Sequence, residues 1–183
     1  MGWLTVDIQG GFMDYKIGEK VIYPNQGVGV IEEICTKNIA GQNEEFYMLR
    51  IVSNNSTVMI PTSNLENVGI RKLCGQKEVK SLLKILRDEL NEHNPDWKNR
   101  YKGNVERMNS GSIFEVTRVL KNLFFLSFQK SLSFREKKMF DRARQLVVSE
   151  IATVQDEAQE KVEKRVDKLL TTTYERVQAQ ATN

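Results

Sequence analysis

A short stretch of the sequence places one large aromatic side chain among several cations. Residues 97–102 read WKNRYK, so Trp97 is followed closely by Lys98, Arg100 and Lys102. An aromatic ring can stack on a base or wedge into an opened base step, while lysine and arginine contact the flanking phosphates. These residue types in this order therefore predict a contact with nucleic acid.

Trp97 also has a second interpretation, as a core residue. Apolar or aromatic residues follow it at helical spacing, which would put them together on one face of a helix. The members of this face are Trp97, Tyr101, Val105 and Met108. Phe134, at the start of a later helix, has the same two interpretations, because it either extends an exposed apolar patch or fills a gap between helices. The spacing leaves both choices open.

Residues that would support catalysis or metal binding are sparse. His93 is the single histidine, and no serine or cysteine lies beside it in a nucleophile context. Cys35 and Cys74 are far apart, without a C-x-x-C motif or a histidine pair, so they predict ordinary thiols and no zinc site. We therefore expect no catalytic residues, no metal, no cofactor and no small-molecule substrate.

The elements that must position these residues fall into two parts. Glycine and proline concentrate in residues 1–70, and neither occurs after Gly111. The first part contains short β-branched or aromatic-rich runs between turn residues, which favour a small antiparallel barrel or a strongly bent sheet. These runs cover 19–23, 28–34, 45–52 and 56–60.

The second part has the apolar period of helices. Residues 133–136 (SFRE) match a capping box that opens a helix. From Met139 to Leu170 the apolar stripe continues, which predicts one long last helix whose final part, after about residue 155, projects, pairs or frays. Earlier stripes cover 79–90, 97–108 and 113–124. The fold class predicted is α+β, with a small antiparallel β domain followed by an all-α domain.

Charge is distributed unevenly between these parts, although the net charge of the chain is only +3. Residues 1–70 contain 4 basic and 8 acidic side chains, a net charge of −4. Residues 71–144 contain 18 and 9, a net charge of +9, and residues 145–183 contain 5 and 7, a net charge of −2. The positive charge thus coincides with the helices, where a polyanion could bind.

The sequence contains no apolar run of the roughly 20 residues that a membrane span needs. Its longest is LFFL at residues 123–126. The first residues lack a basic region followed by an apolar stretch, so they do not predict a secretory signal. We expect a cytoplasmic, nucleoid-associated protein with no membrane partner.

Several motifs, in one order along the chain, resemble the CarD/CdnL family of bacterial transcription regulators that bind RNA polymerase. The resemblance spans residues 15–154, and the MIP and LSF motifs favour the CdnL branch. Residues 1–14, which include Met13 as a candidate initiator, and the segment after about residue 155 lie outside it. The motifs are 16–29 (KIGEKVIYPNQGVG), 40–42 (AGQ), 46–49 (FYML), 59–61 (MIP), 68–71 (VGIR), 97–102 (WKNRYK) and 132–139 (LSFREKKM).

The resemblance implies an N-terminal Tudor-like domain that docks on the β subunit of RNA polymerase. It also implies a helical domain that contacts promoter DNA at the upstream edge of the transcription bubble, where the tryptophan inserts into the minor groove and stabilises the open complex. Asn99 stands where relatives often have a cation, and Lys98 is the candidate substitute. The polymerase-binding residues implied are Lys37, Ile39, Met59 and Pro61. The DNA-binding residues implied are Trp97, Lys98, Arg100 and Lys102, with Val105 and Phe134 in a neighbouring apolar patch.

These expectations divide the chain into four parts. Two alternatives to the transcription regulator stay open. One alternative is an architectural DNA-binding protein that uses the same basic helices without polymerase. The other is a structural scaffold with a projecting coiled-coil tail. The parts are an extension (1–14), a Tudor-like domain (15–71), a helical DNA-interacting domain (72–154) and a helical tail (155–183).

Overall fold

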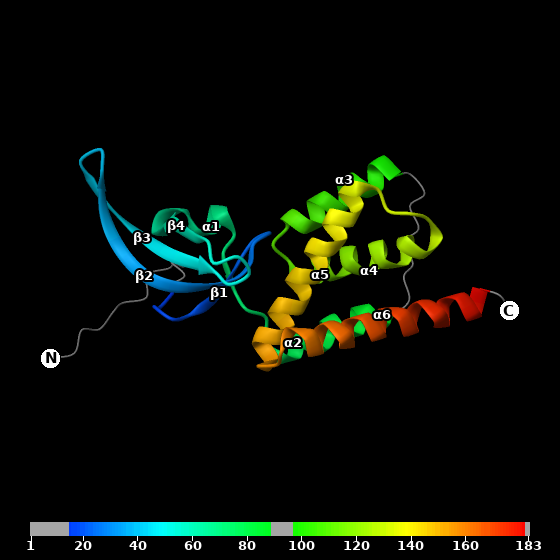
Figure 1. Cartoon of the computed structure of the whole chain (residues 1–183). Coiled ribbons are helices and arrows are strands. Elements are labelled where there is room, and N and C mark those ends of the chain that lie inside the picture. Colours follow the sequence, from blue (N-terminus) through cyan, green and yellow to red (C-terminus); the bar gives the residue numbers. More distant parts are fainter. Residues whose placement is uncertain (1–14, 89–96, 182–183) are drawn as a thin grey trace.

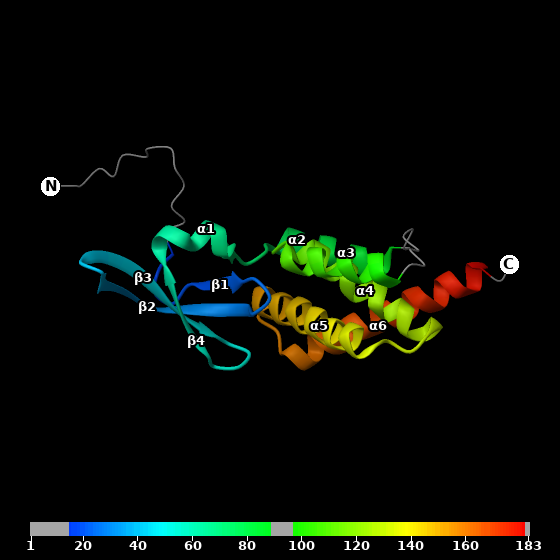
Figure 2. The ribbon, with the colours of Figure 1, turned by 90° about the horizontal axis from the view of Figure 1, so that it is seen from above.

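The protein consists of a sheet lobe and a helical lobe that lie side by side (Figures 1 and 2). The computed structural model describes residues 15–88 and 97–181, and the side chains of residues 97–99 and 181 lie outside this description. The predicted α+β class, with strands before helices, is confirmed.

Within the described residues, five antiparallel strands form one sheet in the order β4-β3-β2-β1-β5. The β2–β3 hairpin is longer than the sequence runs predicted, because a two-residue turn at Ala40 and Gly41 joins the strands directly. Both turn residues have positive φ, 51° and 86°, as this type of hairpin turn requires. The strands are β1 (Lys20–Tyr23), β2 (Gly27–Ile39), β3 (Gln42–Ile51), β4 (Thr57–Pro61) and β5 (Arg71–Lys72).

One face of the sheet forms the core of this lobe. Along β4, Val58 and Ile60 pack into that core while Met59 between them is exposed, as period-two alternation predicts. A bulge between Ile31 and Glu33 adds one residue to β2 and resets its alternation. The buried residues of this core are Tyr15, Val21, Ile31, Tyr47, Leu49, Ile51, Ile60, Leu65 and Ile70.

A short connection, which the sequence patterns did not predict, leads from the sheet to the helices. After β4 the chain forms a 3₁₀ turn (Thr62–Asn64) and helix α1 (Leu65–Val68). Gly69 ends α1 with a φ of 75°, the left-handed conformation that glycine adopts readily. The chain then adds β5 to the sheet edge beside β1 before it enters the helical lobe.

The helices pack around a second core, separate from that of the sheet. Among the described residues, no helix is both long and apolar enough to cross a membrane. The predicted stripes 97–108 and 113–124 belong to separate helices, α3 and α4, and Gly111 between them has a φ of 72°. The helices are α2 (Gln76–Arg87), α3 (Trp97–Asn109), α4 (Ile113–Gln129), α5 (Phe134–Gln155) and α6 (Gln159–Ala181).

The single last helix predicted from the continuous apolar stripe is wrong, because two helices share that stripe. Helix α5 ends at Asp156, whose φ of 52° is left-handed and whose N–H bonds to the carbonyl of Ala152. The chain then turns back, and α6 packs along α2 and α5 (Figure 1). Helix α6 buries Val162, Val166, Leu170 and Thr173. The segment after residue 155 therefore pairs within the lobe and does not project.

Candidate functional site

The first turn of α3 is held against the first turn of α5. Nη2 of Arg100 lies 3.3 Å from Oε1 of Glu136, and the two side chains are only 15% and 7% exposed. Arg100, predicted to contact phosphate, is therefore directed toward α5 in this structure. The side chains of Trp97 and Lys98, the other predicted contacts in this turn, lie outside the described residues.

Glu136 also closes the predicted capping box of α5, which the structure confirms. Its Oε2 accepts hydrogen bonds from the backbone N–H of Ser133 at 3.0 Å and from the Ser133 hydroxyl at 2.8 Å. Burial pushes the pKa of Glu136 upward, but these bonds and the Arg100 guanidinium outweigh burial and hold the pKa below its ordinary value. The carboxylate is thus ionised at neutral pH and links two helix starts.

The other predicted residues of the α3 face differ in how deeply their side chains are buried. Tyr101 and Val105 are half-buried, and Met108 is buried in the helical core. Lys102 is exposed, as a phosphate contact requires. Among its described residues, this face reaches the helical core only at Met108, toward the C-terminal end of α3.

Of the two interpretations of Phe134, the structure supports the exposed one. Its side chain is 73% exposed, and Nζ of Lys138 lies 4.6 Å from the ring centroid, a cation–π contact. Sequence reasoning missed Lys137 and Lys138, which are both exposed in this turn. The basic residues that follow Phe134 in the LSFREKKM motif were the available signal.

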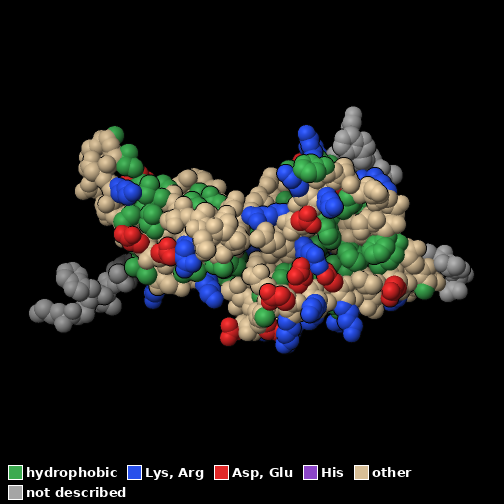
Figure 3. Space-filling view, viewed as in Figure 1, with side chains coloured by type: hydrophobic (Ala, Val, Ile, Leu, Met, Phe, Trp, Pro, Cys, Tyr) green, Lys and Arg blue, Asp and Glu red, His purple; other side chains and the backbone are tan. Residues whose placement is uncertain are grey.

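Residues of α3 and α5 in and after these first turns make what we call the aromatic–basic surface. Figure 3 shows Lys and Arg side chains around a small hydrophobic patch over the upper ends of α3 and α5. A planar apolar group framed by cations suits a base step and its flanking phosphates. The surface comprises Lys102, Val105, Phe134, Lys137 and Lys138.

The second candidate surface lies on the sheet, on the face opposite its core. The register pairs Met59 with Met48 and Pro61 with Phe46, and Phe46 in turn pairs with Cys35. Lys37 and Ile39 follow Cys35 at alternate positions of β2, so the four predicted polymerase-binding residues share this face. We call these four residues, Lys37, Ile39, Met59 and Pro61, the outer sheet surface.

Exposure on this surface is unusual for apolar side chains. Ile39 is 48% exposed and Met59 is 41% exposed, and Pro61 is half-buried. Figure 3 shows hydrophobic side chains gathered on the sheet lobe. Glu33 and Glu44 lie on the same face by register. The surface thus combines adaptable apolar contacts with a charged rim, as protein interfaces do.

The two cysteines are free thiols in different surroundings. Cys35 is half-buried on the outer face of the sheet, and Cys74 is buried where the sheet lobe joins α2. Burial, followed by the nearby charge of Glu150, raises the pKa of Cys74 to about 12, so its thiol is protonated and unreactive at neutral pH. In the described part of the chain, no group of three metal-binding side chains lies close enough to hold an ion. His93 is outside the described residues.

Comparison with known proteins gives two family matches that together cover most of the chain. Residues 15–74 match the CarD-like/TRCF RID domain, and residues 81–167 match the C-terminal domain of CarD. A curated relative, YdeB of Bacillus subtilis, is named as a candidate transcription factor. It is 32% identical over 140 residues, which cover 76% of this chain and 92% of YdeB.

Two solved structures from Myxococcus xanthus are similar to part of the chain. One, described as CdnLNt, is 38% identical and covers 37% of this chain and 92% of that chain, with a TM-score of 0.29. The other, the 72-residue N-terminal domain of CarD, is 37% identical and covers 31% of this chain and 76% of that chain, with a TM-score of 0.28.

Proposed function

Because the chain belongs to the CarD/CdnL family of transcription factors, we propose that it docks on RNA polymerase and stabilises the open promoter complex. In docking, the outer sheet surface binds the polymerase β subunit. Stabilisation uses Trp97 and the aromatic–basic surface, at the upstream edge of the transcription bubble. The observation that carries the proposal is that these two surfaces lie on separate lobes of one chain.

The outer sheet surface has the chemistry of a protein contact. Ile39, beside the β2–β3 turn, and Met59, on β4, both leave apolar area in water on one sheet face. Burial of this area against a partner is favourable. Methionine adapts its shape to an apolar partner at little cost. The sheet lobe carries net negative charge in sequence, so it offers little attraction to DNA.

The helical lobe has the chemistry of a DNA contact. Trp97 supplies the wedge at the opened base step, and Phe134 extends the apolar contact beside it. Lys98, Lys102, Lys137 and Lys138 supply charge for phosphates. Because Arg100 is paired with Glu136, we assign its charge to holding α3 on α5, and any phosphate contact through Arg100 is secondary.

Docking makes a weak DNA contact effective. A tethered surface meets the promoter at a high local concentration, so its affinity for free DNA can stay low. A contact made only with opened DNA shifts the equilibrium toward the open complex by its differential free energy. Stacking of one aromatic side chain is worth roughly 1–3 kcal/mol per base, and about 1.4 kcal/mol changes an equilibrium tenfold.

The lifetime of the open complex with a cognate polymerase tests this proposal. Trp97→Ala is expected to shorten the lifetime by about tenfold, since it removes one stacking contact. Phe134→Ala should shorten it by a smaller factor, without a cost in stability, because the ring is exposed. Trp3→Ala, the other tryptophan of the chain, is the matched control.

Two outcomes would contradict the proposal. If Trp97→Ala lowered the melting temperature and left the lifetime unchanged, Trp97 would be a core residue. If the protein bound free duplex tightly at physiological salt, with a steep salt dependence and no effect on polymerase, it would be an architectural DNA-binding protein.

A further inference from the structure

Several polar contacts lie at the junction of the two lobes, beside the close approach of Leu146 to Gly27. The apolar cores of the sheet and of the helices are separate clusters. Lobes without a large common apolar interface are expected to move relative to each other unless directional contacts hold them. The contacts at this junction therefore decide the angle between the outer sheet surface and the aromatic–basic surface.

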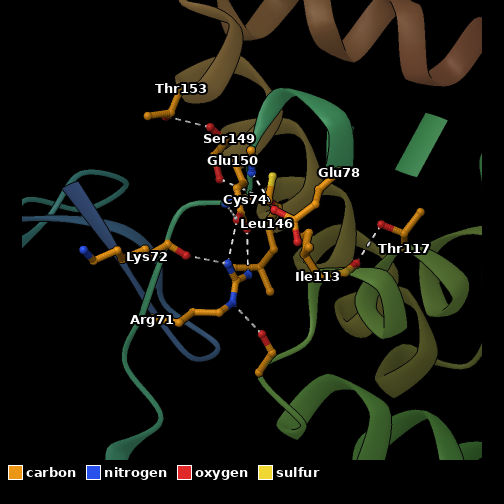
Figure 4. Close-up of polar contacts among 12 residues, drawn as sticks. Arg71, Lys72, Cys74, Glu78, Ile113, Thr117, Leu146, Ser149, Glu150 and Thr153 are labelled. Carbon is orange, nitrogen blue, oxygen red and sulfur yellow. Dashed lines mark hydrogen bonds and ion pairs between the residues drawn. The ribbon is translucent and has the colours of Figure 1, made fainter. Parts of the chain in front are cut away.

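The first junction contact is a buried ion pair (Figure 4). Arg71 of β5 forms two parallel bonds with Glu150 of α5, at 2.7 and 2.8 Å, and its Nε donates to the carbonyl of Gly111 at 2.8 Å. Glu150 also accepts a bond from the backbone N–H of Cys74 at 2.9 Å. The Glu150 side chain is only 2% exposed, and a two-pronged pair of this kind fixes direction as well as distance.

The second junction contact is the β1–β2 turn. Nε of Arg142 donates to the carbonyl of Asn25 at 2.8 Å, and Nδ2 of Asn25 donates to Oδ1 of Asn109 at 2.7 Å. Gly27 follows with a φ of 87°, and a Cβ there would lie 3.3 Å from Leu146, so this turn approaches α5 closely. The turn is thus bonded both to α5 and to the last residue of α3.

The geometry links these contacts to the candidate DNA surface. Arg142, Leu146 and Glu150 recur every four residues, so one stripe of α5 faces the sheet lobe. The same helix begins at the capping box, where Glu136 holds Arg100 of α3. Helix α3 is therefore tied at its first turn to α5 and at its last residue to the sheet lobe.

We propose that Arg142 and Glu150 are positioning residues that fix the angle at which α3 leaves the docked sheet lobe. This proposal rests on the proposed function. With the junction intact, docking on the polymerase presents the first turn of α3 to DNA in one orientation. Without it, the helical lobe reorients about residues 72–75, and the effective concentration of the DNA surface falls.

The test combines Arg142→Ala with Glu150→Gln in the full chain, so that both junction contacts are weakened. Arg144→Ala is the matched control, because Arg144 lies on the same helix but pairs with Glu163 and Asp167 of α6. Residual dipolar couplings report whether both lobes share one alignment. We expect the double variant to lose the common alignment, to keep its affinity for the polymerase β lobe, and to shorten the open-complex lifetime about tenfold.

A second variant and a rescue keep the test independent of folding. Glu150→Gln alone retains the shape of the side chain but removes its charge, so it should disturb the alignment and the lifetime in the same direction. Adding Asn25→Cys and Asn109→Cys to Arg142→Ala, with Cys35→Ser, allows a short bismaleimide cross-link across the junction. The cross-linked protein should recover the wild-type lifetime, and the protein without cross-link should not.

The outcomes separate this proposal from the proposed function. If the lobes lose their common alignment and the lifetime is unchanged, the positioning role is overturned while the proposed function stands. The same holds if the alignment survives in the double variant, or if Arg144→Ala shortens the lifetime equally. If the wild type does not prolong the open complex at all, the proposed function fails and this inference fails with it.

Discussion

The outer sheet surface and the aromatic–basic surface differ in chemistry and in what supports them. On the sheet, Ile39 and Met59 expose apolar area, and strand register alone brings them to one face. On the helices, Lys138 lies over the exposed ring of Phe134, and a polar contact links the starts of α3 and α5. The first surface should therefore bind by burial and resist salt, whereas the second should depend on ionic strength and on the geometry of distant contacts.

The largest expected effect follows from placing a charge on the outer sheet surface. Met59→Glu should weaken binding to the isolated polymerase β lobe by at least about 30-fold, as expected when an interface hot spot worth roughly 2 kcal/mol is lost. The fold should be retained, because Met59 is exposed. Titration calorimetry at two salt concentrations measures both the loss and the expected insensitivity of the wild type to salt.

Val52→Glu is the matched control for this variant. Val52 is also an exposed apolar residue of the sheet lobe, at 44%, but it lies outside the outer sheet surface. Its substitution should leave β-lobe binding unchanged. Equal losses for Met59→Glu and Val52→Glu would mean that the effect is not specific to this surface, and the contrast between the two lobes would disappear.

A smaller effect, with a different signature, is expected on the aromatic–basic surface. Lys102→Ala should weaken binding of upstream fork DNA to the polymerase-bound protein by about threefold to fivefold and reduce the salt slope by about one. Lys164→Ala, an exposed lysine of α6, is the control and should change neither. A loss that did not vary with salt would show that Lys102 contacts something other than phosphate.

Much of this contrast could be predicted from the sequence, because local patterns determine it. Alternation along 56–60 predicts that Met59 points away from Val58 and Ile60, and the core confirms this. The SFRE pattern at 133–136 predicts a capping box, and both of its bonds are present. The position of Phe134 could not be decided by pattern, because an aromatic residue at a helix start is compatible with either environment.

Features that depend on contacts between distant residues could not be predicted. The last helix breaks at Asp156, a non-glycine residue in a left-handed conformation, so composition contained no signal for the turn. Arg100 looked like a phosphate ligand because its partner, Glu136, is 36 residues away. No local pattern distinguishes Arg142 and Glu150 from other charged helix residues, since their partners belong to the sheet lobe and to its connection with α2.

The smallest expected effect concerns acid, which should affect only the helical surface. The pKa of Glu136 is lower in the folded protein than its ordinary value of 4.5. A carboxylate with a lowered folded-state pKa stabilises the fold above its unfolded pKa, and this contribution is lost as the pH falls through the folded pKa. Glu136→Gln keeps the capping bonds but loses the charge, so it should cost about 0.5–1 kcal/mol at pH 7.

Urea unfolding measures this difference when wild type and Glu136→Gln are compared at pH 7 and at successively lower pH below 4.5. We expect the difference in unfolding free energy to shrink as the pH falls, because the wild-type carboxylate then becomes neutral like the glutamine. Glu115→Gln is the control, since its partners Arg107 and Arg118 lie at the α3–α4 side of the lobe and not at the first turn of α5. A difference that stayed constant with pH would show that the Arg100–Glu136 contact stabilises by packing rather than by charge, and the helical surface would then resemble the sheet surface in being insensitive to acid.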